Sequence, residues 1–60
     1  MITEANRKLY EAAVDAAKAL RADTSVSTHE TLNQVTALAN EIADLSDDVV
    51  RQLREEAEAR

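Results

Sequence analysis

The chain has 60 residues, no cysteine, glycine or proline, and a net charge of −5 from 12 acidic and 7 basic residues. A chain this short forms one domain with a small core, and without cysteine it has neither disulfides nor a structural zinc site to reinforce that core. The negative charge opposes nucleic acid and anionic lipid as partners, and no stretch approaches the roughly 18 apolar residues of a membrane span.

The composition favours a particular fold class. Many of the hydrophobic residues are alanine, which favours helix and buries little surface, and the single aromatic residue is Tyr10. Because turns usually recruit glycine and proline, a chain with neither is expected to form long helices with few connections. The first residues lack the basic start and apolar run of a signal peptide. We therefore expect an all-α, cytoplasmic protein.

The first predicted helix covers about residues 3–22. Thr3 is a suitable N-cap, and the residues after it are mostly strong helix formers. Apolar residues recur along one side at a spacing close to that of a helix. This row comprises Ile2, Ala5, Leu9, Ala13, Ala16 and Leu20. Because half of the row is alanine, a neighbouring helix can approach closely. Tyr10, Val14 and Ala17 form a second, weaker row beside it.

A turn is predicted over residues 23–27, where hydroxyl and β-branched residues interrupt the helical composition. Ser27 and Glu30 then fit a capping box, in which the Ser27 side chain caps the backbone and the Glu30 side chain reaches back. The second helix is therefore expected over about 28–58. A connection of this length usually makes two helices antiparallel neighbours, which predicts a helical hairpin.

A wide apolar face runs along the second predicted helix. Its members recur at steps of three and four residues, the spacing of one helical face. We call this row the apolar stripe: Leu32, Val35, Ala39, Ile42, Val49 and Leu53. Leu38 and Leu45 lie beside the stripe and widen it. A face this wide on a helix of this length must be covered by another surface.

The sequence around Ser46 leaves two structures open. Ser46 can cap a third helix, whose N-terminal end Asp47 and Asp48 would favour, and this predicts a compact three-helix bundle. The same local signal can also produce a break or kink at 45–47 within one long helix. Alternatively the helix continues, because the apolar stripe keeps its phase across the site, whereas a turn would usually reset it. We favour the continuous helix.

A continuous second helix would be longer than the first by roughly 15 Å. One hairpin cannot cover the overhang, so we expect two hairpins to pack as a homodimeric four-helix bundle with coiled-coil-like packing. The expected core is Leu9, Ala13, Ala16, Leu20, Leu32, Val35, Ala39, Ile42, Val49 and Leu53. The expected subunit or partner interface is Tyr10, Val14, Leu38, Leu45 and Val50.

The residues do not form a recognisable active site. His29 and Glu30 match the start of the zinc-protease motif H-E-x-x-H, but the fifth position is asparagine and the chain has one histidine. Phosphate-binding loops need glycine, which is absent. Glu41, Asp44 and Asp48 share a helix face, yet the histidines of di-metal bundles are missing, so a solvated acidic face explains them better. We expect no enzyme activity, catalytic residue, cofactor or metal.

The distribution of charge indicates a protein partner. Residues 1–22 hold four bases and three acids, a net of +1, whereas residues 41–60 hold three bases and seven acids, a net of −4. A small interaction module that self-associates and binds or inhibits a protein partner fits these features best. The expected acidic partner face is Glu41, Asp44, Asp47, Asp48 and Glu55.

Two alternative functions remain open. A rigid helix rich in carboxylates can occupy a basic groove meant for nucleic acid, as small acidic inhibitors of phages and mobile elements do. A helix-turn-helix regulator would need the third helix at Ser46, and its Asp47 and Asp48 would repel DNA phosphate. The repulsion argues against nucleic acid as a partner.

Overall fold

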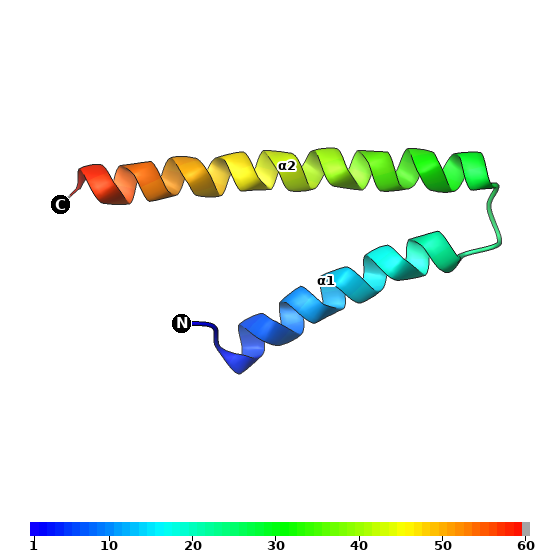
Figure 1. The fold of residues 1–60 in the computed structure, drawn as a ribbon, viewed down its shortest axis with the longest axis horizontal. Helices are drawn as coiled ribbons and strands as arrows, with labels where there is room; N and C mark the ends of the chain where they lie inside the picture. The colour runs from blue at the N-terminus through cyan, green and yellow to red at the C-terminus, as the bar shows by residue number, and fades with distance from the viewer. Residues whose placement is uncertain (60) are drawn as a thin grey trace.

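The computed structural model describes residues 1–59 and contains two helices (Figure 1). Helix α1 spans Glu4–Ala22 and helix α2 spans Thr28–Glu58, and the two run antiparallel from the loop that joins them. No strand occurs among the described residues. The predicted all-α helical hairpin is therefore confirmed, with both helices close to their expected bounds.

Side-chain caps fix where each helix begins. The N–H of Asn6 donates to Oγ1 of Thr3 at 3.0 Å, and the N–H of Glu30 donates to Oγ of Ser27 at 3.1 Å. Each bond satisfies one of the backbone donors that a helix leaves free in its first turn. Both predicted N-caps are confirmed. The return bond of a full capping box, from the Glu30 side chain to the Ser27 backbone, is not formed within residues 1–59.

The loop of residues 23–27 reverses the chain without glycine. No described residue has a positive φ angle, so the turn uses only backbone conformations that any residue adopts. Asp23 ends α1 in an extended conformation, and its Oδ1 accepts a hydrogen bond from the N–H of Ser25 at 2.8 Å. This bond closes an Asx turn, in which a side chain replaces a backbone acceptor. The turn explains how the connection dispenses with glycine.

Helix α2 runs through Ser46 without interruption, and Figure 1 shows it straight. The alternative three-helix bundle and the break or kink at 45–47 are therefore wrong. A break would give up several backbone hydrogen bonds in exchange for one cap, and no glycine or proline is present to favour it. Asp48 instead pairs with Arg51 along the same helix, with Oδ1 and the guanidinium nitrogen 2.7 Å apart.

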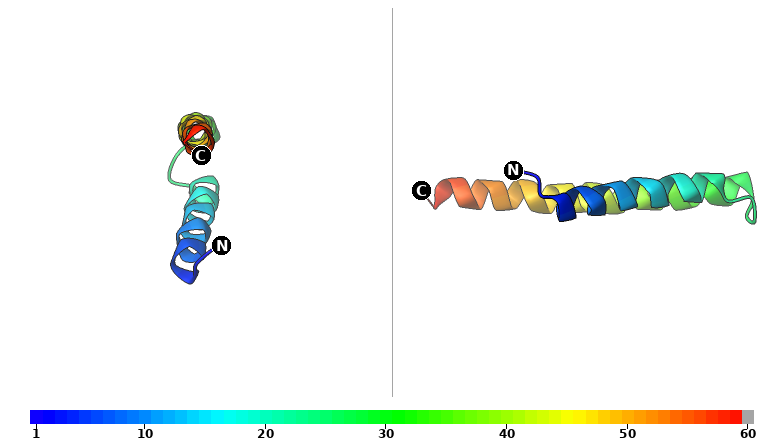
Figure 2. Two further views of the ribbon diagram at one scale, coloured as in Figure 1. Left: turned by 90° about the vertical axis from the view of Figure 1, so that its left-hand side faces the viewer. Right: turned by 90° about the horizontal axis from the view of Figure 1, so that it is seen from below.

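The hairpin is a single layer of two helices (Figure 2). Its principal extents are 51 × 25 × 8 Å, and the smallest is about the width of one helix. The radius of gyration is 15.7 Å, whereas a compact domain of this length has about 10 Å. The helices lie closest beside the loop and diverge toward the N-terminus of α1 (Figure 1). Two helices in one layer cannot enclose a core.

None of residues 1–59 is fully buried. The half-buried residues lie in the loop and along the sides of the helices that meet: Val14, Ala17, Leu20, Val26, Thr31 and Leu38. The predicted core is therefore wrong for a single chain, since of its members only Leu20 is half-buried. The others are exposed: Leu9, Ala13, Ala16, Leu32, Val35, Ala39, Ile42, Val49 and Leu53. The reason is geometric, because α1 meets one edge of the α2 apolar face and then diverges from it.

Candidate interaction surface

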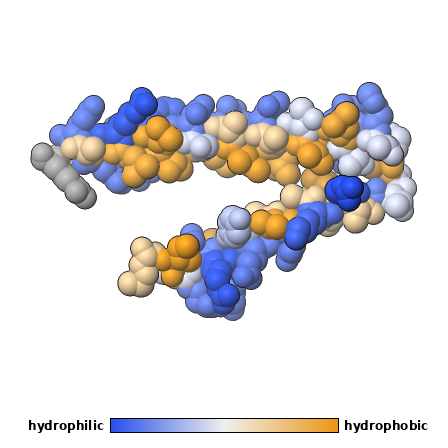
Figure 3. All heavy atoms as spheres, in the orientation of Figure 1, coloured by the Kyte–Doolittle hydropathy of each residue, from blue (hydrophilic) through white to orange (hydrophobic). Residues whose placement is uncertain are grey.

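The apolar stripe is the largest feature that the fold leaves uncovered. From Leu32 to Leu53 it follows α2 for about 31 Å, at roughly 1.5 Å per residue. Ile42 near its middle is 55% exposed and Leu53 at its end is 60% exposed. Figure 3 shows apolar side chains along the edge of α2 that faces the opening between the helices, continuing beyond α1. Monomeric proteins rarely expose a contiguous apolar surface of this length.

The C-terminal part of the apolar stripe extends past α1. Helix α2 has 31 residues and α1 has 19, so α2 is longer by 12 residues, or about 18 Å. Because the C-terminal end of α1 and the N-terminal end of α2 both adjoin the loop, the N-terminal end of α1 lies near the level of residue 47 of α2. Val49, Val50 and Leu53 lie beyond that level, and all three are exposed. Helix α1 of the same chain therefore cannot cover them.

Helix α1 adds a second exposed apolar row. Ile2 and Leu9 are both more than two-thirds exposed, at 74% and 72%. Between Leu9 and Leu20 the row consists of alanine, so its side chains project little from the helix. Small side chains allow another helix to pack at the short end of the usual 8–10 Å range of interaxial distances.

The five residues predicted to form the subunit or partner interface fall into two groups. Val14 and Leu38 are half-buried. Val14 stands eight residues before the end of α1 and Leu38 ten residues after the start of α2, so the two lie at similar distances from the loop and each helix covers part of the other there. Tyr10, Leu45 and Val50 are exposed and remain available to a partner. The interface role of all five stays a prediction.

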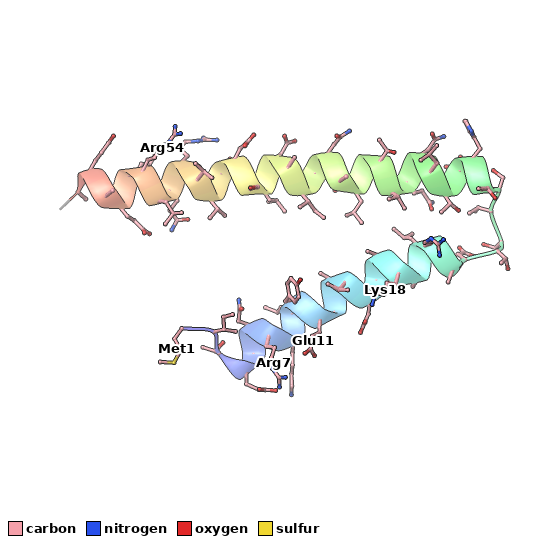
Figure 4. The ribbon with its side chains drawn as sticks, in the orientation of Figure 1. Met1, Arg7, Glu11, Lys18 and Arg54 are labelled. Carbon is pink, nitrogen blue, oxygen red and sulfur yellow. The ribbon has the colours of Figure 1, made fainter. Side chains whose placement is uncertain are left out.

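Charged side chains occupy the outer sides of the hairpin. Figure 4 shows Arg7 and Glu11 pointing away from α2, and Arg54 pointing away from α1. Arg7 forms ion pairs with Glu4 at 2.7 Å and with Glu11 at 3.6 Å. These pairs are exposed, so each contributes little to stability. Arg7, Glu11 and Arg54 therefore lie away from the apolar surface between the helices (Figure 4).

The predicted acidic partner face lies around the sides of α2 away from the apolar stripe. Its members are all exposed: Glu41, Asp44, Asp47, Asp48 and Glu55. No group of three or more His, Asp or Glu side chains in residues 1–59 is placed to hold a metal ion. Binding of a basic partner to this face stays a prediction. The helix-turn-helix alternative loses its basis, because the third helix that it needs is absent from the described chain.

A concavity of about 660 Å³ opens beside the loop, where Arg21, Leu32 and Val35 are among its lining residues. Small-molecule sites usually enclose most of the ligand and aim a few polar groups at it, but no described residue here is fully buried. Asp23 at its rim has a lowered pKa, because the Ser25 side chain and the Ser25 N–H both donate to its carboxylate. Those bonds stabilise the loop, so they explain the lowered pKa as a structural feature.

No protein-family model, curated protein or solved structure matches this chain. Within residues 1–59, neither helix combines the length and the hydropathy that a bilayer span requires.

Proposed function

We propose that the chain is a non-enzymatic protein–protein interaction module, which self-associates and binds or inhibits a protein partner through its helix faces. One observation carries the proposal: the hairpin exposes far more surface than a compact chain of the same mass. Its accessible surface is 5595 Å², whereas a compact protein of 6.6 kDa exposes about 3,900 Å². The excess is about 1,700 Å².

An excess of this size is that of a large interface. In a standard protein–protein complex each partner buries about 800 Å², and obligate complexes bury more. The excess in this hairpin is roughly twice the standard value, and the apolar stripe supplies the large side chains in it. Aliphatic residues in a row, with charge kept to the outer sides, match the apolar centre and polar rim of protein interfaces.

The hairpin alone has little burial to offset the cost of ordering. Fixing the backbone and side chains costs roughly 1.5 kcal/mol per residue, and in small domains burial barely balances that cost. Most of the stability of helices in proteins comes from packing of an amphipathic face, yet no described residue is fully buried here. Another polypeptide that covers the apolar stripe supplies the missing burial. Folding and binding are then linked.

The open shape also supports a role without catalysis. Catalytic groups work best where water is excluded, because electrostatic interactions strengthen in a low dielectric. In the hairpin every titratable side chain from residue 1 to residue 59 stands on an exposed surface. Such a surface suits recognition by shape and apolar contact.

Thermal unfolding followed by circular dichroism tests the proposal. If association covers the apolar stripe, the Tm rises as the protein concentration increases from about 1 to 200 µM, because mass action favours the bound state. Sedimentation should then show a particle heavier than 6.6 kDa. A largely unfolded monomer at every concentration would overturn self-association and would leave a different protein as the cover of the apolar stripe. A monomer that unfolds cooperatively, with the same Tm at every concentration, would overturn the proposal.

A further inference from the structure

The overhang of α2 restricts what can cover the apolar stripe. A covering partner must provide apolar surface beside α1 and also for about 18 Å beyond it, where Val49, Val50 and Leu53 are exposed. A short helix placed against the hairpin near the loop would leave this end bare. The partner must therefore match nearly the whole length of α2.

We propose that a second copy of the chain covers the apolar stripe, with its loop at the opposite end of the assembly. The α2 helices of the two copies then run antiparallel about a two-fold axis near Ala43. This inference rests on the proposed function and specifies its first partner. Ala43 is the middle residue of Thr28–Glu58, so the two α2 helices overlap over their full length.

The apolar residues of α2 are spaced almost symmetrically about Ala43. Leu32 lies eleven residues before Ala43 and Leu53 ten after it. Leu32 of one copy and Leu53 of the other therefore lie at nearly the same height along the bundle. Val35 and Val50, eight before and seven after, form the next level inward. Leu38 and Val49, then Ile42 and Leu45, match in the same way. The apolar residues of the overhang in one copy thus lie opposite apolar residues near the loop of the other copy.

The lengths of the helices favour loops at opposite ends. Helix α2 is about 46 Å long and α1 about 28 Å, at 1.5 Å per residue. With the loops at opposite ends, the two α1 helices together exceed the length of α2, so every level of the bundle holds three or four helices. With the loops at the same end, the last 18 Å or so would hold only two helices. The opposite-end arrangement therefore covers both overhangs.

The surface area agrees with an obligate dimer. If each copy buries its excess of about 1,700 Å², the interface totals about 3,400 Å². Interfaces of obligate homodimers run from roughly 2,000 to more than 5,000 Å². A second copy is thus large enough to cover the surplus without further chains.

The distribution of charge also favours loops at opposite ends of the dimer. Residues 47–58 hold five acids and two arginines, a net of −3. With loops at the same end, two such segments would lie side by side and repel each other. With loops at opposite ends, they stand far apart, and each lies at the end of the bundle where Lys18 and Arg21 of the other copy are found.

Distances between spin labels test the orientation directly. The chain has no cysteine, so Asp44→Cys and Glu55→Cys each provide a single attachment site on the outer side of α2. Position 44 is one residue from Ala43 and position 55 is twelve residues from it. In the proposed dimer the two labels at 44 lie about 20 Å apart and those at 55 about 40 Å apart, given 1.5 Å per residue and helices about 10 Å wide. Pulsed electron–electron double resonance measures both distances.

The possible results separate this inference from the proposed function. Nearly equal distances at positions 44 and 55 would mean loops at the same end and would overturn the orientation, while the interaction module would stand. Assemblies of three or more copies would overturn the dimer alone. An unfolded monomer without dipolar coupling would overturn the dimer and self-association, and would leave only a different protein as the cover of the apolar stripe. A folded monomer without dipolar coupling would overturn both. Each labelled variant should keep the Tm of the parent chain, which controls for damage by the label.

Discussion

Asp23 and Ser27 stand at the two ends of the loop and give it a defined shape. Each side chain accepts a hydrogen bond from a backbone N–H two or three residues further on, at 2.8 Å for Asp23 and 3.1 Å for Ser27. Such bonds are local, so the sequence is sufficient to predict a turn and an N-cap here. The Asx turn at Asp23 is not among the sequence predictions, although an aspartate in a turn is able to accept from the backbone N–H two residues further on.

The pKa of Asp23 reports on the hydrogen bonds of the loop. Donation from the Ser25 side chain and backbone N–H lowers this pKa below its ordinary value of 3.8. Because the folded-state pKa is the lower one, the bonds stabilise the loop above the unfolded-state pKa, and this stabilisation is lost as pH falls through the folded-state pKa. An NMR titration should give a value below 3.8, and Ser25→Ala should raise it. Ser46→Ala, which removes a distant hydroxyl, should leave it unchanged, and a Ser25→Ala variant with the parent pKa would contradict the assignment.

Helix α2 illustrates a conflict between a local signal and a longer one. Ser46 with the aspartates after it has the composition of a helix start, yet the spacing of the apolar stripe continues across it. The longer signal prevails because a cap satisfies one backbone donor, whereas a break leaves several donors and acceptors without partners. At this scale the sequence predicted the bounds of both helices, and only the alternative break at 45–47 is wrong.

Two alanine substitutions compare Ser27, which caps α2, with Ser46, which lies inside it. Ser27→Ala removes the N-cap of α2 and should lower the free energy of unfolding by about 1 kcal/mol. Ser46→Ala replaces a residue inside the helix by a better helix former and should raise the free energy of unfolding by up to about 0.5 kcal/mol. Urea unfolding at one fixed protein concentration compares the variants. A loss on Ser46→Ala as large as that on Ser27→Ala would mean that a helix begins at Ser46 in solution.

The periodicity of the sequence identifies the apolar faces of both helices but not what each face contacts. The face of α2 is wide, and the direction in which α1 leaves the loop decides which edge it meets. Leu38 on one edge is half-buried, whereas Leu32 and Ile42 remain exposed. No residue in either helix encodes this direction by itself, because it depends on the loop and on packing across both helices. For that reason the sequence predicted the apolar set correctly and the single-chain core wrongly.

Leu53 is the position where the hairpin and the proposed dimer predict different behaviour. It is 60% exposed and lies beyond α1, so in an isolated hairpin Leu53→Asp would change little. In a dimer it would bury a carboxylate against apolar side chains at two symmetric sites, at a cost of about 4 kcal/mol or more, which is roughly a thousandfold in Kd.

Sedimentation across a range of concentrations measures the effect of Leu53→Asp, and Gln52→Asp is the matched control. The control adds the same charge one position away, on a side of α2 outside the apolar stripe, and should weaken association by less than tenfold. Because helix stability depends on the packed face, Leu53→Asp should also remove the rise of Tm with concentration. Equal effects of the two substitutions would show that net charge, rather than coverage of the apolar stripe, controls assembly. Full association of Leu53→Asp would place the end of α2 outside every interface.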